Sequence, residues 1–381
     1  MGILRTNKIS GLGTDGTVFQ GVTRFDTQGY FVAPSGTTDQ RNAGITTTDG
    51  TIRFNTDSQK LEFYAQSQWW EMVIDTPNLG VGSNTDAGAR GVVAGSGPDG
   101  LGASNVIQYI NILSTGNSID FGDLITGRRQ LGSLGSSTRG IFAGGYTPTL
   151  LNSIEFITIS STGNAQSFGN LTQTRRCNNH GLSNSTRGIF HGGYTTAPTA
   201  AVNTIDYITI ASTGNAVDFG DLITSRERGA SCSSSTRGIV AGGVTSSTTN
   251  TIDFITISTL GNSFDFGDLT TQQFFAGGCS SPTRGLFGGG DNPTKTNIID
   301  FITISTIGNA SSFGNLTVAR DGVSACSSST RGTWHGGRAP GAGSNIIDYA
   351  IISTQGNAVD FGDLYFGTDM QTACSNAHGG L

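Results

Sequence analysis

Five cysteines and four histidines are the side chains of this chain best suited to metal binding or nucleophilic chemistry. Cys177 stands apart, and the other cysteines recur at intervals of 47 or 48 residues: Cys232, Cys279, Cys326 and Cys374. An odd number does not suit a disulfide framework, and one cysteine per interval does not bring ligands within about 2.3 Å of one ion. Leu134 and Leu182 hold the equivalent place elsewhere, so we expect buried, reduced cysteines at a packing site and no metal.

The sequence lacks the usual catalytic constellations. No Gly-x-Ser-x-Gly elbow lies between a strand pattern and a helix pattern, no His-Glu-x-x-His occurs, and the glycine-rich stretches end strands instead of opening helices. No Asp- and Asn-rich turn has the twelve-residue calcium spacing. The non-repeating acids Asp99, Glu155 and Asp321 are scattered, which favours no carboxylate pair for glycoside hydrolysis. We therefore expect a non-enzymatic protein without a cofactor.

A unit of about 48 residues recurs six times from Gly88 onward. Each unit opens an apolar run with an Arg-Gly pair, at Arg90, Arg139, Arg187, Arg237, Arg284 and Arg331. Each ends with a Phe-Gly-Asp/Asn-Leu box, at Phe121, Phe168, Phe219, Phe266, Phe313 and Phe361. The spacings between successive arginines are 49, 48, 50, 47 and 47 residues, so one structural unit with loops of varying length explains the pattern.

The hydrophobic pattern inside each unit has period two and predicts four short strands. In the third unit these cover residues 178–185, 188–193, 204–211 and 216–222. Every unit has a Gly-Asn step between its third and fourth strands, and we expect a tight hairpin there because glycine tolerates positive φ.

Four-stranded units in tandem form either the blades of a propeller or a solenoid. The first strands consist largely of small residues, as at 229–234, 324–328 and 372–375, which suits the crowded innermost strand of a propeller. The segment before Arg90 is a poor first strand, so residues 371–376 are expected to complete the first blade. We predict an all-β chain in which residues 79–381 form a six-bladed β-propeller.

Two histidines hold the same position before Gly-Gly, His191 in the third unit and His335 in the sixth. In a six-membered ring these units face each other, so the pair could bind a ligand on the axis. Alternatively the position merely tolerates histidine, because two histidines lack the third protein ligand of a typical zinc site. His180 and His378 show no recognisable spacing.

The repeated polar residues are expected to be scaffold. The arginine of each Arg-Gly pair recurs beside turn residues, so we expect it to bind a carboxylate or backbone carbonyls at a blade edge. The Asp or Asn of each box recurs equally regularly.

The loop that follows each Gly-Gly changes completely between units, and divergent loops on a rigid scaffold suit recognition. Neutral drift in exposed turns is the alternative. Aromatic and planar side chains bring contact area at low entropic cost, so the candidate ligand-binding residues are Tyr146, Tyr194, Trp334 and Arg338. Trp334 has a second interpretation, as a core residue of its strand like Phe142 and Phe190.

The apolar runs that end in Gly-Gly resemble the kelch motif: Phe142-Ala-Gly-Gly, Phe190-His-Gly-Gly, Val240-Ala-Gly-Gly and Trp334-His-Gly-Gly. The resemblance covers about 300 residues and implies a kelch-like β-propeller. It departs from kelch in the fourth strand, where the Phe of the box stands in the place of the usual Trp.

Residues 1–78 do not share the repeat. Residues 50–64 alternate as two strands around a polar turn, and Trp69-Trp70-Glu-Met-Val73 follows. Phe63, Tyr64, Trp69 and Trp70 offer more apolar surface than so short a segment buries alone, so we expect this module to attach to a partner or to identical copies.

This N-terminal part, together with residues 2–12 and 29–41, resembles a short module near the start of tailed-phage virion proteins, tail fibres especially, that is common in phages of marine cyanobacteria. The resemblance implies a virion protein that contacts other virion proteins through residues 1–78 and forms a homo-oligomer. One reading is a tail-fibre or tail-associated adhesin whose propeller loops touch a host surface glycan or protein. The other is a non-catalytic decoration of the head or tail.

Composition argues against nucleic acids and membranes as partners. Glycine accounts for 58 of 381 residues, only 13% are charged, and the formal net charge is −6. Without a Lys/Arg cluster we expect no nucleic-acid binding. The sequence has no secretory signal pattern and no run of about 18 apolar residues, so we expect no membrane insertion.

Overall fold

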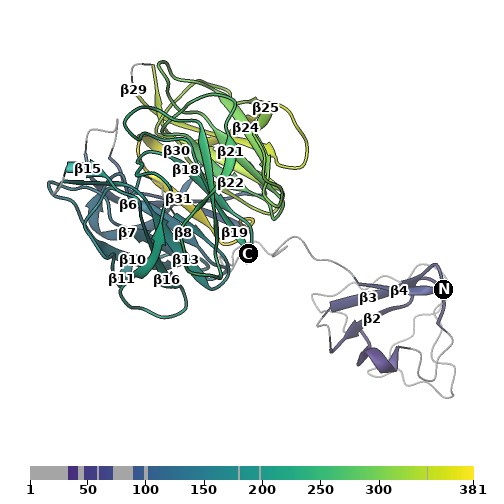
Figure 1. Ribbon diagram of the computed structural model, residues 1–381. Coiled ribbons are helices and arrows are strands. Elements are labelled where there is room, and N and C mark those ends of the chain that lie inside the picture. The colour runs from purple at the N-terminus through teal and green to yellow at the C-terminus, as the bar shows by residue number, and fades with distance from the viewer. Residues whose placement is uncertain are drawn as a thin grey trace. The chain divides into compact units, whose positions relative to one another are not determined.

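The computed structural model describes residues 33–41, 47–57, 60–71, 89–97, 102–178, 181–196, 199–340 and 342–381. The chain divides into two compact units, Met1–Pro77 and Asn78–Leu381 (Figure 1). The fold is all-β, as expected, and the helical element among the described residues is the 3-10 helix η1 (Thr38–Gln40). No helix in these ranges has the length and apolar character of a membrane span.

The N-terminal unit contains one sheet of the order β1-β2-β3-β4. Its strands are β1 (Ser35–Gly36), β2 (Ile52–Asn55), β3 (Lys60–Ala65) and β4 (Gln68–Glu71). The expected pair of strands is confirmed as β2 and β3, which place Phe54 opposite Leu61. Gln66 and Ser67 join β3 to β4 with φ values of 53° and 62°, the left-handed conformation that a two-residue hairpin needs.

The described part of the second unit contains six principal sheets, numbered 1 to 6 in the chain order of their second strands. From sheet 1 to sheet 6 the first strands are β31 (Thr372–Ser375), β8 (Gly132–Gly135), β12 (Gly181–Ser183), β18 (Ala230–Ser233), β22 (Gly277–Ser280) and β26 (Ser324–Ser327). The second strands are β5 (Arg90–Ala94), β9 (Arg139–Ala143), β13 (Arg187–His191), β19 (Arg237–Ala241), β23 (Arg284–Gly288) and β27 (Arg331–His335).

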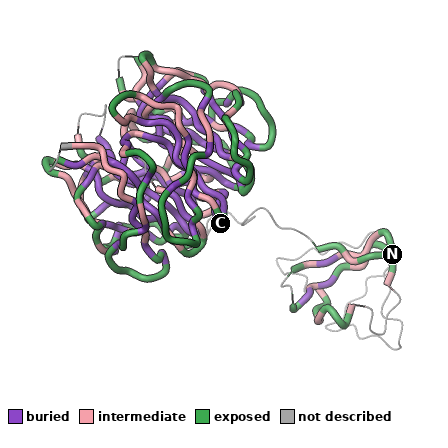
Figure 2. Tube along the Cα trace, viewed as in Figure 1, coloured by how far each residue is buried: buried purple, intermediate pink, exposed green. Residues whose placement is uncertain are grey.

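The remaining strands lie farther out in each sheet. The third strands are β6 (Ser104–Asn111), β10 (Ser153–Thr158), β16 (Thr204–Thr209), β20 (Thr251–Thr256), β24 (Ile298–Thr303) and β29 (Ala342–Ile351). The fourth strands are β7 (Ile119–Arg128), β11 (Gln166–Asn170), β17 (Val217–Asp221), β21 (Phe264–Asp268), β25 (Ser311–Asn315) and β30 (Val359–Thr368). The first and second strands are almost wholly buried, whereas the fourth strands are more exposed. Figure 2 shows buried segments gathered in the interior of this unit and exposed ones at its periphery.

Sheet 1 is assembled from both ends of the second unit. β31 pairs antiparallel with β5 and places Cys374 opposite Val92. This confirms that the C-terminal segment completes the first sheet.

The six first strands contact one another in the cyclic order β31, β8, β12, β18, β22, β26 and back to β31. Serine hydroxyls join them: Ser183 Oγ donates to the Gly135 carbonyl at 2.6 Å, and Ser233 Oγ donates to the Ser183 carbonyl at 2.7 Å. Ser280, Ser327 and Ser375 continue this series. The approach is so close that a Cβ at Gly135 would lie 2.3 Å from the Ser375 carbonyl oxygen. The small residues of these strands are therefore a packing requirement.

The Gly-Asn steps join neighbouring sheets. The predicted hairpins between third and fourth strands are confirmed, but their loops are not tight. Residues 159–165 separate β10 from β11, and within them the Gly163 N–H donates to the Phe121 carbonyl of sheet 1 at 2.8 Å. Asn164 Oδ1 accepts the Asp123 N–H of the same sheet at 3.0 Å. A Cβ at Gly122 would lie 2.5 Å from the Gly163 oxygen, which explains the glycine of the Phe-Gly box. The other five Gly-Asn steps make the equivalent bonds.

The Arg-Gly pairs are scaffold, as expected. The Arg90 guanidinium donates to the Ile159 carbonyl of sheet 2 at 2.8 Å and lies 4.4 Å from the Tyr109 ring centroid. The other five arginines donate to the corresponding isoleucine carbonyls of their neighbouring sheets. Gly91 leaves room for the neighbouring cysteine, because a Cβ there would lie 2.7 Å from Cys326 Sγ.

The cysteines pack between sheets as expected. All five are free and buried. Burial in apolar surroundings raises the pKa of Cys326 to about 12, so its thiol stays protonated at neutral pH.

Four sheets bury an arginine against an acid of the third strand: Arg128–Glu155, Arg175–Asp206, Arg226–Asp253 and Arg320–Asp348. Sheet 5 keeps the acid as Asp300 but has Gln273 in the arginine's place. Asp300 accepts only from Thr270, at 2.7 Å and 2.9 Å, and burial raises the pKa of its carboxyl. Gln273 is buried, and its side-chain amide makes no hydrogen bond.

Candidate functional site

Side chains that differ from sheet to sheet gather at one end of the second unit. The first strand begins and the second strand ends at the same edge of each antiparallel sheet, so the segments beside these termini pair. The paired residues, which we call the mouth, are Arg129 with Tyr146, Arg176 with Tyr194, Glu227 with Val244, Phe274 with Asp291, and Asp321 with Arg338. Because the contacts between sheets repeat, the backbone at this end is similar from sheet to sheet. The side chains of the mouth vary around the ring.

The backbone next to the mouth is held in an uncommon conformation. In several sheets the residue two positions before the first strand has positive φ, including Gln130 at 58°, Arg228 at 60°, Phe275 at 59° and Met370 at 58°. Their peptide groups bond around the ring, as where the Phe275 N–H donates to the Arg228 carbonyl at 2.7 Å. Left-handed backbone costs non-glycine residues on the order of 1–2 kcal/mol each, so these hydrogen bonds fix the positions of the side chains beside them.

Sheets 2 and 3 form a basic and aromatic sector of the mouth. The Arg176 guanidinium lies 4.7 Å from the Tyr146 ring centroid and 5.6 Å from that of Tyr194. Arg129 lies 5.5 Å from the Tyr146 centroid. Two candidates from the sequence, Tyr146 and Tyr194, are therefore brought together, both half-buried, by an arginine that sequence reasoning missed.

Sheets 6 and 1 form an acidic sector. Arg338, the third candidate, lies here with a half-exposed side chain, but its guanidinium binds Asp321 through Nη2 at 2.6 Å and Nε at 3.3 Å. Lys295 also reaches Asp321, at 3.3 Å. Hydrogen bonding to Asp321 raises the pKa of Arg338, and burial raises that of Asp369. Arg338 is at the mouth but is committed to an internal pair.

The prediction that Trp334 contacts a ligand is wrong. Its side chain is fully buried in β27, and its Nε1 donates to the Gly277 carbonyl at 3.1 Å. It fills the space beside Gly288, where a Cβ would lie 2.7 Å from Trp334 Nε1. The core interpretation is confirmed, and the shared register with Phe142 and Phe190, both fully buried, was the signal for it.

The interpretation of His191 and His335 as a facing pair on the axis is also wrong. Both are fully buried within their own sheets, and neither lines the central cavity. His335 Nε2 lies 3.9 Å from Cys326 Sγ of the same sheet, and burial lowers the pKa of His335 to about 3.

The central cavity encloses about 50 Å³ and is lined by all six first strands together with His378. His378 Nε2 lies 2.9 Å from the Gly135 carbonyl and 3.2 Å from Ser183 Oγ. Gly379 and Gly380 fit beside it only because they lack side chains, since a Cβ at Gly380 would lie 2.0 Å from the Ser183 oxygen. This volume holds a few water molecules, so the cavity suits no larger ligand.

The loops after Gly-Gly are more alike in backbone conformation than in sequence. Those of sheets 2 to 6 share one hydrogen bond to the carbonyl of the second glycine, at 2.7 to 3.0 Å, from Leu151, Val202, Thr249, Thr296 and Ser344. The loops of sheets 3 and 6 also form small hairpins, from β14 (Tyr194–Thr196) with β15 (Thr199–Ala201) and from β28 (Arg338–Ala339) with β29. Variation at the mouth is therefore chiefly variation of side chains.

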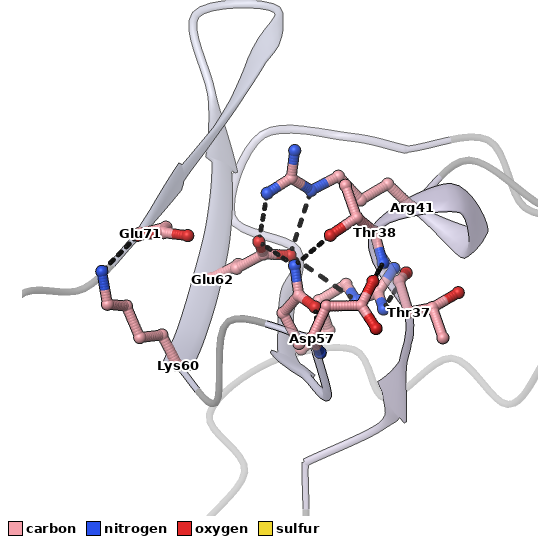
Figure 3. Close-up of polar contacts among 9 residues, drawn as sticks. Thr37, Thr38, Arg41, Asp57, Lys60, Glu62 and Glu71 are labelled. Carbon is pink, nitrogen blue, oxygen red and sulfur yellow. Dashed lines mark hydrogen bonds and ion pairs between the residues drawn. The ribbon is translucent and has the colours of Figure 1, made fainter.

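The N-terminal unit buries its polar face. Glu62 is fully buried and pairs with Arg41, as Figure 3 shows. Asn55 Nδ2 donates to Glu62 Oε1 at 2.7 Å, and Arg53 Nε lies 3.8 Å from Glu62 Oε2. Hydrogen bonding to Arg41 lowers the pKa of Glu62. Lys60 and Glu71 form a more exposed pair nearby (Figure 3).

The four aromatic candidates of this unit lie on both faces of its sheet. Phe63 pairs with Trp70, which is 42% exposed, and Ile52 on the same face is 46% exposed. Tyr64 and Trp69 lie on the face of Glu62, with their ring centroids 5.4 Å apart. The sheet thus presents apolar side chains outward and charged ones inward.

Comparison with known proteins identifies no relative, because no family model and no curated protein matches the chain. Within the described ranges, no group of three or more His, Cys, Asp or Glu side chains could hold a metal ion.

Proposed function

We propose that the second unit is a six-bladed β-propeller and that the chain is a phage virion protein, a tail-fibre or tail-associated adhesin that binds a host surface through the mouth. The cyclic contacts of the first strands and the completion of sheet 1 by β31 support the propeller. The resemblance of the N-terminal part to tail-fibre modules supports the virion assignment.

One observation carries the adhesin. The contacts between sheets repeat almost identically, whereas the described mouth pairs change from Arg–Tyr in sheets 2 and 3 to Glu–Val, Phe–Asp and Asp–Arg in sheets 4, 5 and 6. A surface that discriminates one partner cannot be alike in all six sheets, and recognition residues characteristically lie on loops of a rigid scaffold. The mouth combines half-buried aromatic rings with guanidiniums, the side chains that dominate binding surfaces.

The N-terminal unit acts in this proposal as the attachment module. Its outward-facing Ile52 and Trp70 favour burial against identical copies or another virion protein. Binding at the mouth and assembly through this unit are then separate functions of separate units.

The test uses the full chain and cyanobacterial cells. We expect the protein to sediment with cells of a susceptible strain and the double variant Y146A/Y194A to lose this binding. Tyr365 is 82% exposed on β30, so Y365A removes the same side chain away from the mouth and should bind normally. Absence of binding across a broad panel of strains, or equal loss with Y365A, would contradict the adhesin and favour a decoration of the head or tail.

A further inference from the structure

We infer that the basic sector of the mouth binds the acidic groups, carboxylates or sulfate esters, of a polysaccharide. This inference rests on the proposed function and names the chemical class of its ligand. The site consists of Arg129, Arg176, Tyr146, Tyr194 and Asn178, from sheets 2 and 3.

The first argument is charge. Arg129, Arg176 and Arg228 bring three guanidiniums to three consecutive sheets of a chain whose formal net charge is −6. Arg228 is paired with Glu227 through Nη2 at 3.3 Å. Among the described residues, neither Arg176 Nε nor Arg228 Nε makes a hydrogen bond. Arg176 therefore retains donor capacity, and guanidinium groups bind carboxylates and sulfates through paired N–H donors.

The second argument is the setting of that arginine. Its guanidinium carbon lies 4.7 Å from the ring centroid of Tyr146 and 5.6 Å from that of Tyr194, and both tyrosines belong to the backbone pairs of the mouth. Stacking on aromatic rings limits the rotamers of a guanidinium. A sugar also has apolar C–H faces, which pack well on tyrosine rings.

The third argument is a buried amide without a partner. Asn178 follows Arg176 by two residues, and its backbone N–H donates to the Gln130 carbonyl at 3.0 Å. Its side chain is buried, yet within the part of the chain that the structure describes neither Nδ2 nor Oδ1 makes a hydrogen bond. An amide that offers both a donor and an acceptor matches sugar hydroxyls, which do both. Buried polar groups rarely stay unsatisfied, so this amide marks a place for a polar ligand.

The acidic sector narrows the ligand further. Asp321 belongs to sheet 6, where Lys295 and Arg338 pair with it, and Asp369 belongs to sheet 1, where Arg338, Arg129 and Lys295 are the cations near it. A densely charged polyanion such as a nucleic acid would meet repulsion there, because it carries a charge at every step along its backbone. A polysaccharide with widely spaced acidic groups can place one at Arg176 and neutral sugars elsewhere.

The experiment measures binding of the full chain to four immobilised probes: polygalacturonate, chondroitin sulfate, neutral dextran and single-stranded DNA. We expect binding to one or both acidic polysaccharides and little to dextran or DNA. R129Q/R176Q should lose about tenfold or more in affinity, and N178A should lose a few-fold. R338Q removes one positive charge from the acidic sector and should change affinity less than about twofold. Melting temperatures show that each variant is folded.

Several outcomes would overturn the inference. Equal binding to DNA would indicate general attraction to polyanions, and equal loss with R338Q and R129Q/R176Q would place the site elsewhere. Binding to cyanobacterial cells without binding to either acidic polysaccharide would refute the ligand class while the proposed adhesin stands. Absence of binding to both cells and polysaccharides would refute the two proposals together.

Discussion

The two units bury charged groups in different ways. In the N-terminal unit a single carboxylate, Glu62, collects Arg41, Arg53 and Asn55, so one network holds the segment around η1 against the sheet. In the second unit four separate arginine–acid pairs are buried beside apolar clusters that span neighbouring sheets. A change at Glu62 therefore affects the whole N-terminal network, whereas a change in one pair of the second unit leaves the other three pairs in place.

Removal of residues 371–381 is the most severe test of this difference, because it acts on the contact that all six sheets share. The deletion removes β31, leaves β5 paired on the β6 side alone and breaks the cyclic order of first strands. We expect the melting temperature of the second unit to fall by about 10 °C or more, as measured by circular dichroism. Removal of residues 1–77 is the control and should leave that transition unchanged. A deletion of 371–381 that melts with the full chain would contradict closure by β31.

Glu62 provides the corresponding test in the N-terminal unit. E62Q leaves Arg41 and Arg53 without their carboxylate, and breaking a buried ion pair costs about 3 kcal/mol of unfolding free energy. We expect the N-terminal unit to unfold while the transition of the second unit is unchanged. Circular dichroism and Trp fluorescence follow unfolding, and the variant without residues 1–77 identifies the transition of the second unit. E71Q removes the exposed partner of Lys60 and should cost less than about 1 kcal/mol. Equal effects of the two variants would show that the buried network is not central.

The same carboxylate gives the N-terminal unit its pH dependence. The pKa of Glu62 is lowered by folding, so its contribution is present above the unfolded-state pKa and is lost as pH falls through the folded-state pKa. We therefore expect the stability of this unit to decline below about pH 4.5, and the decline should be much smaller in E62Q.

Within the second unit, sheets 3 and 5 sharpen the comparison. D206N removes the partner of Arg175 at 3.0 Å and should cost about 3 kcal/mol. D300N removes a buried carboxylate that has no arginine, so we expect little loss or a gain at pH 7. Because folding raises the pKa of Asp300, its protonated carboxyl contributes to stability below the unfolded-state pKa. This contribution to stability is lost as pH rises through the folded-state pKa. Urea unfolding at pH 7 measures both variants, and equal losses would contradict the role assigned to the arginines.

The smallest effect is expected from restoring the missing pair. Q273R places an arginine opposite Asp300, as in sheets 2, 3, 4 and 6, and should raise the unfolding free energy by about 1 kcal/mol. Q273R/D300N is the matched control and should be less stable than the parent, since its arginine has no acid. A gain in the double variant equal to that of Q273R would show that packing, not pairing, is responsible.

Sequence alone predicted the features that recur six times. The strand pattern, the small first strands and the scaffold role of the Arg-Gly arginines were evident because repetition separates structure from chance. The role of the Gly-Asn steps was missed because their partners, such as Phe121 for Gly163, lie in another sheet. The buried arginines were missed although each follows the Phe of its box by seven residues. Glu155, set aside as a scattered acid, is the partner of one of them.

The mouth was predictable only in part. Tyr146 and Tyr194 could be nominated as aromatic residues beside variable loops, but their contacts with Arg176 depend on the pairing of turns far apart in sequence. Trp334 failed as a candidate because its orientation depends on Gly288, a gap in the neighbouring sheet that no local pattern reveals.

The pairing of β31 with β5 also determines when sheet 1 can be completed during synthesis. The partners in this pair lie about 280 residues apart, and ribosomes add about 5–20 residues per second. The apolar strand β5 therefore emerges from the ribosome tens of seconds before its partner is made. During that interval the nascent chain carries an incomplete first sheet, and the five sheets made in between must fold beside an open edge.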